Sequence, residues 1–309
     1  MKKIDFHIHI ESDVPVEVSA GYLEDMCDRH GYCGVCAMSF TYGVSEKEPY
    51  FEKCNEKAME LKLRMKDSYA FANPLVGKDF AKQTEQLMND GFDGIKLLRG
   101  GKPDYVKKYG DTYDSEVYAD FFALCEEKQY PILMHNNDPA YCWDKTKASP
   151  RAIKMGWVYD ESHSTHKRLY ESAETVLKKY PRLNIALAHF GFYSENIDRA
   201  FELMEAYPNL KMDITPALNI YKELSAVHDK AEEFFRKYND RLIFGTDAVN
   251  VLEGEDRAYN DLKNAVTTHF LTGEGERDIQ GRCTRAISLT EEMLENIYYK
   301  NAMRFIGKL

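Results

Sequence analysis

The stretch Lys3–Ile10 reads KIDFHIHI, an apolar run interrupted at every second position by a residue that can bind a proton or a cation. Side chains alternate between the two faces of a β-strand, so Asp5, His7 and His9 are expected on one face and the apolar residues between them on the other. Two imidazoles on one face can converge on a single cation, and imidazole suits zinc, iron and nickel. Two polar residues on a half-exposed strand would give the same pattern, so the later strands must discriminate between these interpretations.

Seven further segments have the composition of strands, and each predicted strand is followed by a segment with the helical spacing of apolar residues. The predicted strands are Ile4–Ile10, Gly34–Phe40, Tyr69–Leu75, Gly94–Leu98, Tyr130–Asn136, Asn184–His189, Leu210–Thr215 and Leu242–Thr246. The predicted helices are Ala20–Arg29, Pro49–Lys66, Phe80–Asn89, Ser115–Glu127, Lys167–Lys179, Glu195–Ala206, Ile220–Tyr238 and Arg257–Thr268. This alternation predicts an α/β fold, a (β/α)8 TIM barrel formed as a single domain by residues 1–309.

Two features extend the predicted barrel. Leu289–Ile306 has the apolar stripe of an extra C-terminal helix, and Thr290 is placed to cap its N-terminus. Long loops are expected after strand four, over Gly100–Asp114, and after strand five, over Asp138–His166. Connections of this length are commonly functional, and both leave the carboxyl ends of strands, where barrel enzymes hold their catalytic groups.

Composition narrows the classes of function. The chain has 41 basic and 51 acidic residues and a net charge of −10, which argues against nucleic acid or an anionic membrane as a partner. It has neither a signal-peptide-like start nor an apolar run long enough for a membrane helix. The seven cysteines form no disulfide-like framework, and Cys33 and Cys36 are interpreted as core thiols of a buried strand. These observations favour a cytoplasmic protein.

Polar residues end three of the later predicted strands. PILMHNNDP places His135 at the end of strand five, NIALAHFG places His189 at the end of strand six, and LIFGTDAV places Asp247 at the end of strand eight. Such side chains are costly to bury unless they are paired or bound to a metal. In a closed barrel they would join His7 and His9 at one mouth. Their placement, more than the number of histidines, predicts a metal site.

These motifs resemble the amidohydrolase superfamily, and within it the branch that contains aminocarboxymuconate-semialdehyde decarboxylase and related lactonases and decarboxylases. The resemblance extends from IDFHIHI through GFDGIKLL, LMHNNDP, YPRLNIALAHFG and RLIFGTDAV to LTEEMLENIYYKNAMRFIG. It implies a (β/α)8 barrel that holds one divalent metal, most commonly Zn²⁺ with Mn²⁺ as the alternative, and it argues against a second metal. The implied ligands are His7, His9, His135 and Asp247. His189 would orient or polarise the bound water or substrate, or help to hold a second metal.

The lysine of strand four has two interpretations. In GFDGIKLL, Lys96 lies within an apolar strand whose outer face is covered by helices, so it is expected to point into the barrel. Binuclear members of the superfamily carboxylate a lysine here to bridge two metals, whereas we interpret Lys96 as an unmodified partner for an anionic substrate. Leu97–Leu98–Arg99 replaces the His-Pro that often follows in this branch. Arg99 is therefore a candidate for binding a substrate carboxylate and, equally, for a solvated loop residue.

The implied ligand set favours a metal-dependent hydrolase that acts on a small carbonyl compound such as a lactone, ester or amide. An ion with an open position lowers the pKa of bound water, Asp247 can move its proton, and His189 can stabilise the developing oxyanion. A metal-dependent decarboxylase of an aromatic or unsaturated carboxylic acid is the alternative. Asp138 and Trp143, after strand five, are candidates for substrate contact, and they are equally explained as a turn residue and as packing of the loop.

Two other classes of protein fit the sequence less well. A phosphoesterase that begins with the same HxH should show further His and Glu ligands between strands one and five, and none is well placed. A barrel retained only as a binding module should have lost a ligand, yet all five expected positions are filled. The predicted partner is therefore a small-molecule substrate. A homodimer is compatible with the resemblance, which leaves the oligomeric state open.

Overall fold

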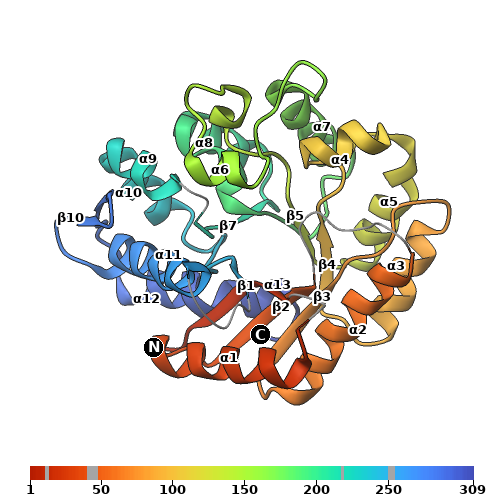
Figure 1. Ribbon diagram of the computed structural model, residues 1–309, viewed down its shortest axis with the longest axis horizontal. Coiled ribbons are helices and arrows are strands. Elements are labelled where there is room, and N and C mark those ends of the chain that lie inside the picture. The colour runs from red at the N-terminus through yellow and green to blue at the C-terminus, as the bar shows by residue number, and fades with distance from the viewer. Residues whose placement is uncertain (11–13, 40–47, 217–218, 250–254) are drawn as a thin grey trace.

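The computed structural model describes residues 1–10, 14–39, 48–216, 219–249 and 255–309. Its main sheet is parallel and curled, with strand order β8-β7-β6-β5-β4-β3-β2-β1-β9, and helices surround it (Figure 1). The strands of this sheet are β1 (Ile4–Ile10), β2 (Gly34–Ser39), β3 (Ser68–Ala72), β4 (Gly94–Leu97), β5 (Ile132–Met134), β6 (Ile185–Leu187), β7 (Lys211–Asp213), β8 (Leu242–Ile243) and β9 (Ala248–Val249).

The last strand position of the barrel is divided between two short strands. β8 pairs with β7 and β9 pairs with β1, so together they join the two edges of the sheet. Between these pairings the amide of Phe6 donates a hydrogen bond to the carbonyl oxygen of Phe244 (3.2 Å), and the amide of Asp247 donates one to the carbonyl oxygen of His7 (2.8 Å). The eighth predicted strand, Leu242–Thr246, thus corresponds to β8 and the segment that leads to β9. The predicted (β/α)8 barrel is confirmed.

Helices follow the strands in the predicted order. The prediction over Phe80–Asn89 has the same bounds as α3, whereas the single helix predicted over Ile220–Tyr238 is wrong, because the chain breaks at Val227 into two helices. The helices are α1 (Val16–His30), α2 (Glu48–Arg64), α3 (Phe80–Asn89), α4 (Pro103–Tyr109), α5 (Ala119–Lys128), α6 (Pro150–Lys154), α7 (His166–Lys179), α8 (Ile197–Ala206), α9 (Ile220–Ala226), α10 (His228–Lys237), α11 (Glu255–Thr272), α12 (Glu291–Glu295) and α13 (Asn301–Phe305).

An antiparallel hairpin of β10 (Glu276–Ile279) and β11 (Arg282–Arg285) lies outside the barrel sheet (Figure 1). Its two-residue turn is Gln280–Gly281, and both residues have positive φ, as tight hairpin turns require. This hairpin is not among the elements predicted from the sequence. Its strands are short and rich in charge, so they lack the alternation of apolar residues on which strand prediction depends.

The C-terminal segment closes the end of the barrel at which the strands begin. Phe6 and Phe71 point inward and pack against Phe305 of α13, with ring centroids 5.7 and 6.2 Å from it. The amide of Phe244 donates to the carbonyl of Ile297 (2.9 Å), which ties this segment to the eighth strand position. Inward-facing apolar side chains and the C-terminal segment therefore form one core beneath the mouth.

The predicted extra helix is present as α12, a π-helical turn over Asn296–Lys300 and α13 in succession. Thr290 caps it as expected, because its hydroxyl oxygen accepts a hydrogen bond from the amide of Met293 (3.3 Å). Within the π-helical turn the backbone hydrogen bonds join residues five apart instead of four. The spacing of apolar residues in the sequence does not reveal this change.

A β-bulge in β1 changes which side chains face the barrel interior. Between Asp5 and Ile8, β1 has two residues where β2 has one. Phe6 therefore packs inside the barrel, and the next residue, His7, also points inward. The expected alternation is wrong here, because Asp5 does not share the inward face with His7. It accepts hydrogen bonds from the amide and the hydroxyl of Thr246 instead, at 2.9 and 2.6 Å. Bulges are common beside active sites, where they re-aim a side chain.

The two long connections carry short helices rather than irregular chain alone. Gly100–Asp114 contains α4, and Asp138–His166 contains α6. Gly101 lies against the end of β5, where a Cβ atom would be 1.9 Å from the carbonyl oxygen of His135, so only glycine fits. This close approach brings Lys102, the next residue, to the pocket at the barrel mouth.

All seven cysteines are free thiols. Cys36 is buried as predicted, but Cys33 is exposed, so the interpretation of both as core thiols is wrong for Cys33. Across the described residues, we find no helix with the length and apolar character needed to cross a bilayer.

We expect Phe6→Ala to lower the free energy of unfolding by about 3–5 kcal/mol, because it removes a fully buried ring from the core beneath the mouth. Leu63→Ala is the matched control, since Leu63 is 80% exposed on α2 and should change stability by less than about 0.5 kcal/mol. Urea unfolding of both variants is the measurement. Equal losses in the two variants would contradict this assignment of the core.

Candidate metal centre and active site

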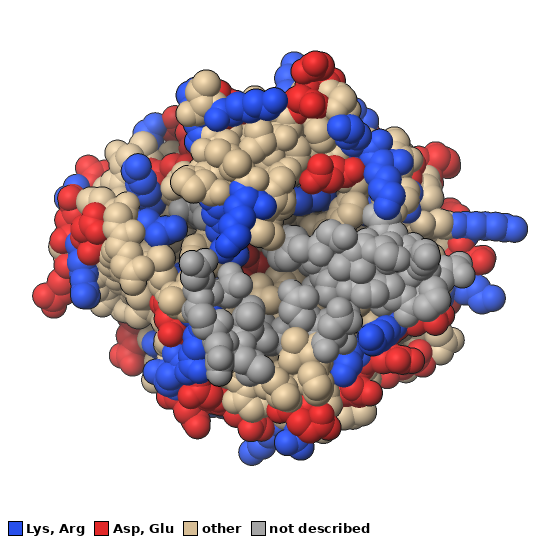
Figure 2. Space-filling view, viewed as in Figure 1, with Lys and Arg blue, Asp and Glu red and all other residues tan. Residues whose placement is uncertain are grey.

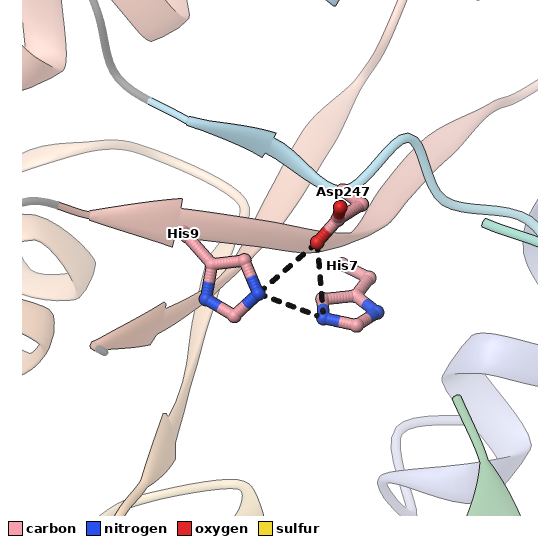
Figure 3. Close-up of side chains that lie close together, drawn as sticks. All are labelled: His7, His9 and Asp247. Carbon is pink, nitrogen blue, oxygen red and sulfur yellow. Dashed lines mark hydrogen bonds and ion pairs between the residues drawn. The ribbon is translucent and has the colours of Figure 1, made fainter. Parts of the chain in front are cut away.

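Three side chains converge at the barrel mouth: His7 and His9 of β1, and Asp247, which directly precedes β9 (Figure 3). The Nε2 atoms of the two imidazoles are 3.1 Å apart. Oδ1 of Asp247 lies 3.1 Å from Nε2 of His9 and 3.8 Å from Nε2 of His7. Two nitrogens and one oxygen thus face one point, and all three belong to the ligand set implied by the sequence.

The spacing of these atoms fits a divalent cation. Metal–ligand bonds of about 2.0–2.1 Å at tetrahedral angles place ligand atoms roughly 3.3 Å apart, close to the three distances found here. Oδ1 of Asp247 is also buried, with no hydrogen bond to any of the described residues. An unsatisfied carboxylate oxygen is costly to bury, and a bound cation would satisfy it. The donor set and its geometry therefore fit a metal ion.

Asp213, the last residue of β7, fixes the orientation of His7. Its Oδ2 lies 2.7 Å from Nδ1 of His7, and both side chains are fully buried. Because a carboxylate only accepts, Nδ1 carries the proton and Nε2 keeps its lone pair. Burial lowers the pKa of His7 well below its ordinary value, and repulsion from Lys96 adds to this effect. His7 is therefore neutral, the form of imidazole that binds metals.

The same carboxylate sets the tautomer of His189 through Thr215. Oδ1 of Asp213 accepts from the hydroxyl of Thr215 (2.6 Å) and from the amide of His189 (2.7 Å). Since the hydroxyl has one hydrogen, its oxygen accepts from Nδ1 of His189 (2.8 Å), which leaves a lone pair on Nε2. Burial lowers the pKa of His189 well below its ordinary value. In this tautomer Nε2 of the neutral His189 can accept a proton but has no hydrogen to donate. It is therefore better suited to act as a base than to stabilise an oxyanion, which is the role that the sequence predicts.

Both predicted catalytic residues have a left-handed backbone, with φ of 57° at His189 and 54° at Asp247. This conformation is unfavourable for residues other than glycine and clusters at functional sites. Two contacts hold this conformation at Asp247. The amide of Asp247 donates to the carbonyl of His7, and the ammonium of Lys263 contacts both the carbonyl oxygen of Asp247 and, at 3.4 Å, its Oδ2. Gly245 makes room nearby, because a Cβ atom there would lie 2.9 Å from Cβ of His7.

The fourth implied ligand, His135, follows β5 and lines the pocket at the barrel mouth, but the structure does not bring it into the group formed by His7, His9 and Asp247. Its Nε2 is 3.2 Å from Oδ1 of Asp138. Lys102 and Tyr159 both donate to Oδ2 of Asp138, at 2.6 and 2.5 Å. Burial raises the pKa of this carboxyl, but attraction to Lys102 and the His135 contact outweigh burial and hold the pKa well below its usual range. Asp138 is therefore an anion that orients His135 and Lys102.

Lys96 of β4 points into the barrel, as predicted, and is 1% exposed. Its Nζ lies 3.1 Å from Nε2 of His7. Burial lowers the pKa of Lys96 to about 8, and attraction to Asp213 and Asp247 opposes this effect. The ammonium thus lies beside the converging ligands and close to its point of deprotonation. Its contact with a substrate and its unmodified state stay predictions.

Two residues predicted to contact the substrate do not line the described pocket. Arg99 pairs with Asp111, donates to the carbonyl of Val76 (3.1 Å) and stacks over the ring of Tyr109 (3.9 Å). Trp143 donates through its indole nitrogen to the carbonyl of Ser164 (3.0 Å), which ties it to its own loop. Trp157, from the same connection, lines the pocket instead.

The pocket in front of the converging ligands is rich in cations. Four basic side chains and two carboxylates line it beside His9, His135 and His189, and an aromatic wall completes it. Figure 2 shows basic side chains beside a narrow hollow near the centre of the face of the molecule that is turned to the viewer. The basic residues are Lys96, Lys102, Arg151 and Lys263, the carboxylates are Asp138 and Asp247, and the aromatic residues are Tyr141, Trp157, Phe192 and Tyr259.

Residues 4–308 match a family model described as Amidohydrolase. The chain belongs to this amidohydrolase family. The family is metal-dependent, and the group of two histidines and an aspartate at the barrel mouth fits a metal site. The resemblance drawn from the strand-end motifs is confirmed. A search of curated proteins finds no match to the chain.

Solved structures share the fold over almost the whole chain. An uncharacterised TIM-barrel protein from Bordetella bronchiseptica is 12% identical, with a TM-score of 0.64 and coverage of 100% of this chain and 99% of that one. A dihydroxybenzoic acid decarboxylase from Polaromonas with bound manganese is 14% identical (0.57; 99% and 97%). A dihydroorotase from Campylobacter jejuni is also 14% identical (0.54; 99% and 83%). Identities this low establish the fold alone.

Sequence reasoning missed several residues that shape the site. Asp213 is the last residue of β7, but the strand predicted from LKMDITP runs on to Thr215, so the strand-end signal that identified Asp247 did not apply to it. Thr215 and Lys263 carry no such signal, because their roles depend on contacts with residues far away in the chain. Lys102 reaches the pocket only through the tight approach of Gly101 to β5.

We expect Asp213→Asn to weaken metal affinity about 10- to 100-fold, because the amide no longer fixes the tautomer of His7. Affinity for zinc is measured by competition with a chromogenic chelator, and circular dichroism checks the fold. Asp198→Asn is the control, since Asp198 is exposed and pairs with Lys230 on the surface. An unchanged affinity in Asp213→Asn would contradict the role assigned to this carboxylate.

Proposed function

We propose that this protein is a mononuclear metal-dependent hydrolase of a small carbonyl compound such as a lactone, ester or amide. The convergence of His7, His9 and Asp247, with Nε2 of His7 presented by Asp213, is the observation that carries this proposal. These residues would hold one Zn²⁺, with Mn²⁺ as the alternative. His135 stays the implied fourth ligand, and to bind the ion through Nε2 it would have to release its contact with Asp138. A divalent ion there lowers the pKa of a water molecule and polarises a carbonyl oxygen.

The residues around the ligands supply the proton transfers that hydrolysis needs. Nε2 of His189 has a lone pair and faces the pocket from a buried, neutral ring, so it can take a proton from the attacking water. The second oxygen of Asp247 offers an alternative acceptor, held in place by Lys263. The proton then passes to the leaving group, so that its expulsion creates no unsolvated anion.

Two lysines on the pocket wall can position the substrate. Lys96 and Lys102 both line the pocket, and Lys102 is fixed by Asp138. An ammonium group beside a carboxylate of the substrate would fix the distance between that carboxylate and the reacting carbonyl. The structure thus favours substrates that carry an anionic group in addition to the bond that breaks.

Decarboxylation of an aromatic or unsaturated acid is the second candidate function. The aromatic wall of Tyr141, Trp157, Phe192 and Tyr259 beside four basic residues suits a planar carboxylate. The proposed hydrolase and this alternative share the metal ligands and differ in what leaves the substrate. The two reactions are therefore separated by their products.

We expect wild-type protein purified without chelator to hold close to one zinc or manganese ion per chain by inductively coupled plasma mass spectrometry. His7→Ala and Asp247→Asn should lose it, because each removes a converging ligand, whereas Asp198→Asn should keep it. No metal in the wild type, with none taken up on dialysis against zinc or manganese, would contradict the proposal.

The loaded enzyme is then screened with lactones, amides and aromatic acids in H₂¹⁸O. Hydrolysis places one ¹⁸O atom in the product acid and releases no carbon dioxide. Release of carbon dioxide without ¹⁸O in the remaining product would instead assign the decarboxylase.

We expect kcat/KM for an anionic substrate to fall as the pH rises through about 8, because the Lys96 ammonium loses its charge there. A divalent ion bound to His7 would repel this ammonium and shift the inflection to lower pH. Lys96→Gln should lower kcat/KM at every pH and abolish the inflection. A pH profile that is the same in wild type and Lys96→Gln would contradict a role for the charge.

A further inference from the structure

A groove runs between α2 and α3 in the helical layer that surrounds the barrel (Figure 1). α2 packs against α1, and α3 packs against α5, where the rings of Phe80 and Phe121 stack with their centroids 4.3 Å apart. Over their described residues, α2 and α3 pack little against each other. The space left between them has a volume of about 870 Å³, and none of its lining residues lines the pocket at the metal ligands. We call this space the α2–α3 groove.

One face of α2 forms the first wall of the groove. Its residues recur at the three- and four-residue spacing of a helix face and extend over about 16 Å, or roughly three turns. They are Glu52, Asn55, Glu56, Met59, Glu60 and Leu63. The second wall comes from α3 and the residues around it, among them Leu75 and Leu87. A groove of this length between two helices has the shape that accepts a third helix, because ridges of side chains on one helix pack between those of its neighbours.

Apolar side chains are exposed in the groove. Leu63 is 80% exposed, more than any other large apolar residue in the part of the chain that the structure describes. Met59, Leu75 and Leu87 are half-buried, and Phe92 is buried. A single exposed leucine is ordinary on a protein surface, but apolar residues gathered in one place mark sites of interaction. The α2–α3 groove therefore offers an apolar surface to a binding partner.

The rim of the groove is acidic. Its described lining residues include five carboxylates and a single ammonium. Glu52, Glu56 and Glu60 are exposed and stand four residues apart on α2, where like charges repel one another and destabilise the helix. Lys62 of the same helix does not balance them, because it pairs with Asp93 at 2.7 Å. A basic partner relieves this repulsion, so the charge of the rim favours cations.

We propose that the α2–α3 groove binds an amphipathic helix of a partner protein, with an apolar stripe flanked by lysine or arginine residues. The stripe covers Met59 and Leu63, and the basic flanks meet the glutamates of α2. Recognition of this kind places apolar anchors at helical spacing into a groove. A second copy of this chain is a poorer occupant, because each copy has a net charge of −10 and the acidic rim repels it. The proposal does not depend on the proposed hydrolase.

The test measures binding of a fluorescein-labelled peptide to the full chain by fluorescence anisotropy at physiological salt. The peptide has about 14 residues of leucine and lysine, with the leucines three and four positions apart so that they form one face of a helix. Wild type is expected to bind it with a dissociation constant of about 1–10 μM. A peptide of the same composition with its leucines spread around the helix should bind about tenfold more weakly, since it has no apolar stripe.

Charge-reversal variants test the rim. Glu56→Lys combined with Glu60→Lys should weaken binding of the striped peptide about tenfold, because the two lysines repel its basic flanks. The control combines Glu24→Lys with Glu233→Lys. These two glutamates are exposed on α1 and α10 and do not line the groove, and the control changes the net charge by the same amount. It should leave the affinity unchanged.

Two leucine variants test the apolar surface. Leu63→Ser should weaken binding about fivefold, because the peptide loses an apolar contact. Leu309→Ser is the matched control, since Leu309 is 66% exposed and does not line the groove. All the substituted residues are exposed, so each variant should keep the circular dichroism spectrum and the metal content of the wild type.

Failure of wild type to bind the striped peptide, or equal losses in the groove variants and their controls, would overturn the proposal. Equal affinity for the two peptides would assign the binding to unspecific charge attraction and would overturn it as well. Sedimentation velocity tests the second copy as occupant, because a wild-type dimer that becomes a monomer in Leu63→Ser would give the groove to that contact instead. Peptide binding without any bound metal would refute the proposed hydrolase and leave this proposal in place.

Discussion

The contact between His7 and Asp213 is the interaction on which the rest of the site depends. It joins β1 to β7 across the interior of the barrel, at 2.7 Å and without access to solvent. A buried carboxylate needs hydrogen-bond donors, and Asp213 obtains them from His7, Thr215 and the amide of His189. One residue that must be satisfied for folding therefore sets the tautomers of two of the imidazoles at the reaction site, those of His7 and His189.

The pocket adds a second constraint, which is the balance of charge. Lys96, Lys102 and Lys263 each contact a carboxylate or an imidazole of the site, so each cation is held in place before any ligand binds. Arrays of fixed charges act without the reorganisation that water requires, which is the general basis of electrostatic catalysis. The contacts that stabilise the site thus also fix the positions of its cations.

The sequence predicts the architecture well and the details of the site in part. The strands and most helices follow from the spacing of apolar residues, and the strand-end rule places His7, His9 and Asp247 together as expected. It does not predict which nitrogen of His189 carries a proton, since that depends on Thr215. Nor does it predict that Arg99 turns away to Asp111, because the direction of a loop side chain depends on tertiary contacts. The local sequence pattern thus predicts where a residue lies in the barrel, whereas the direction of its side chain depends on contacts with residues far away in the chain.

The bulge in β1 allows one strand to direct both a core side chain and the two histidines into the barrel, although they lie an odd number of residues apart. Before it, Phe6 fills the barrel interior, and after it His7 and His9 face the mouth on the inward side. In a strand of strict period two, an inward Phe6 would send both histidines outward into the helical layer. The extra residue therefore changes which side chains face inward between the part of the strand that packs in the core and the part that carries the histidines. Loss of that one residue would leave a barrel able to pack its core while its imidazoles point away from the mouth.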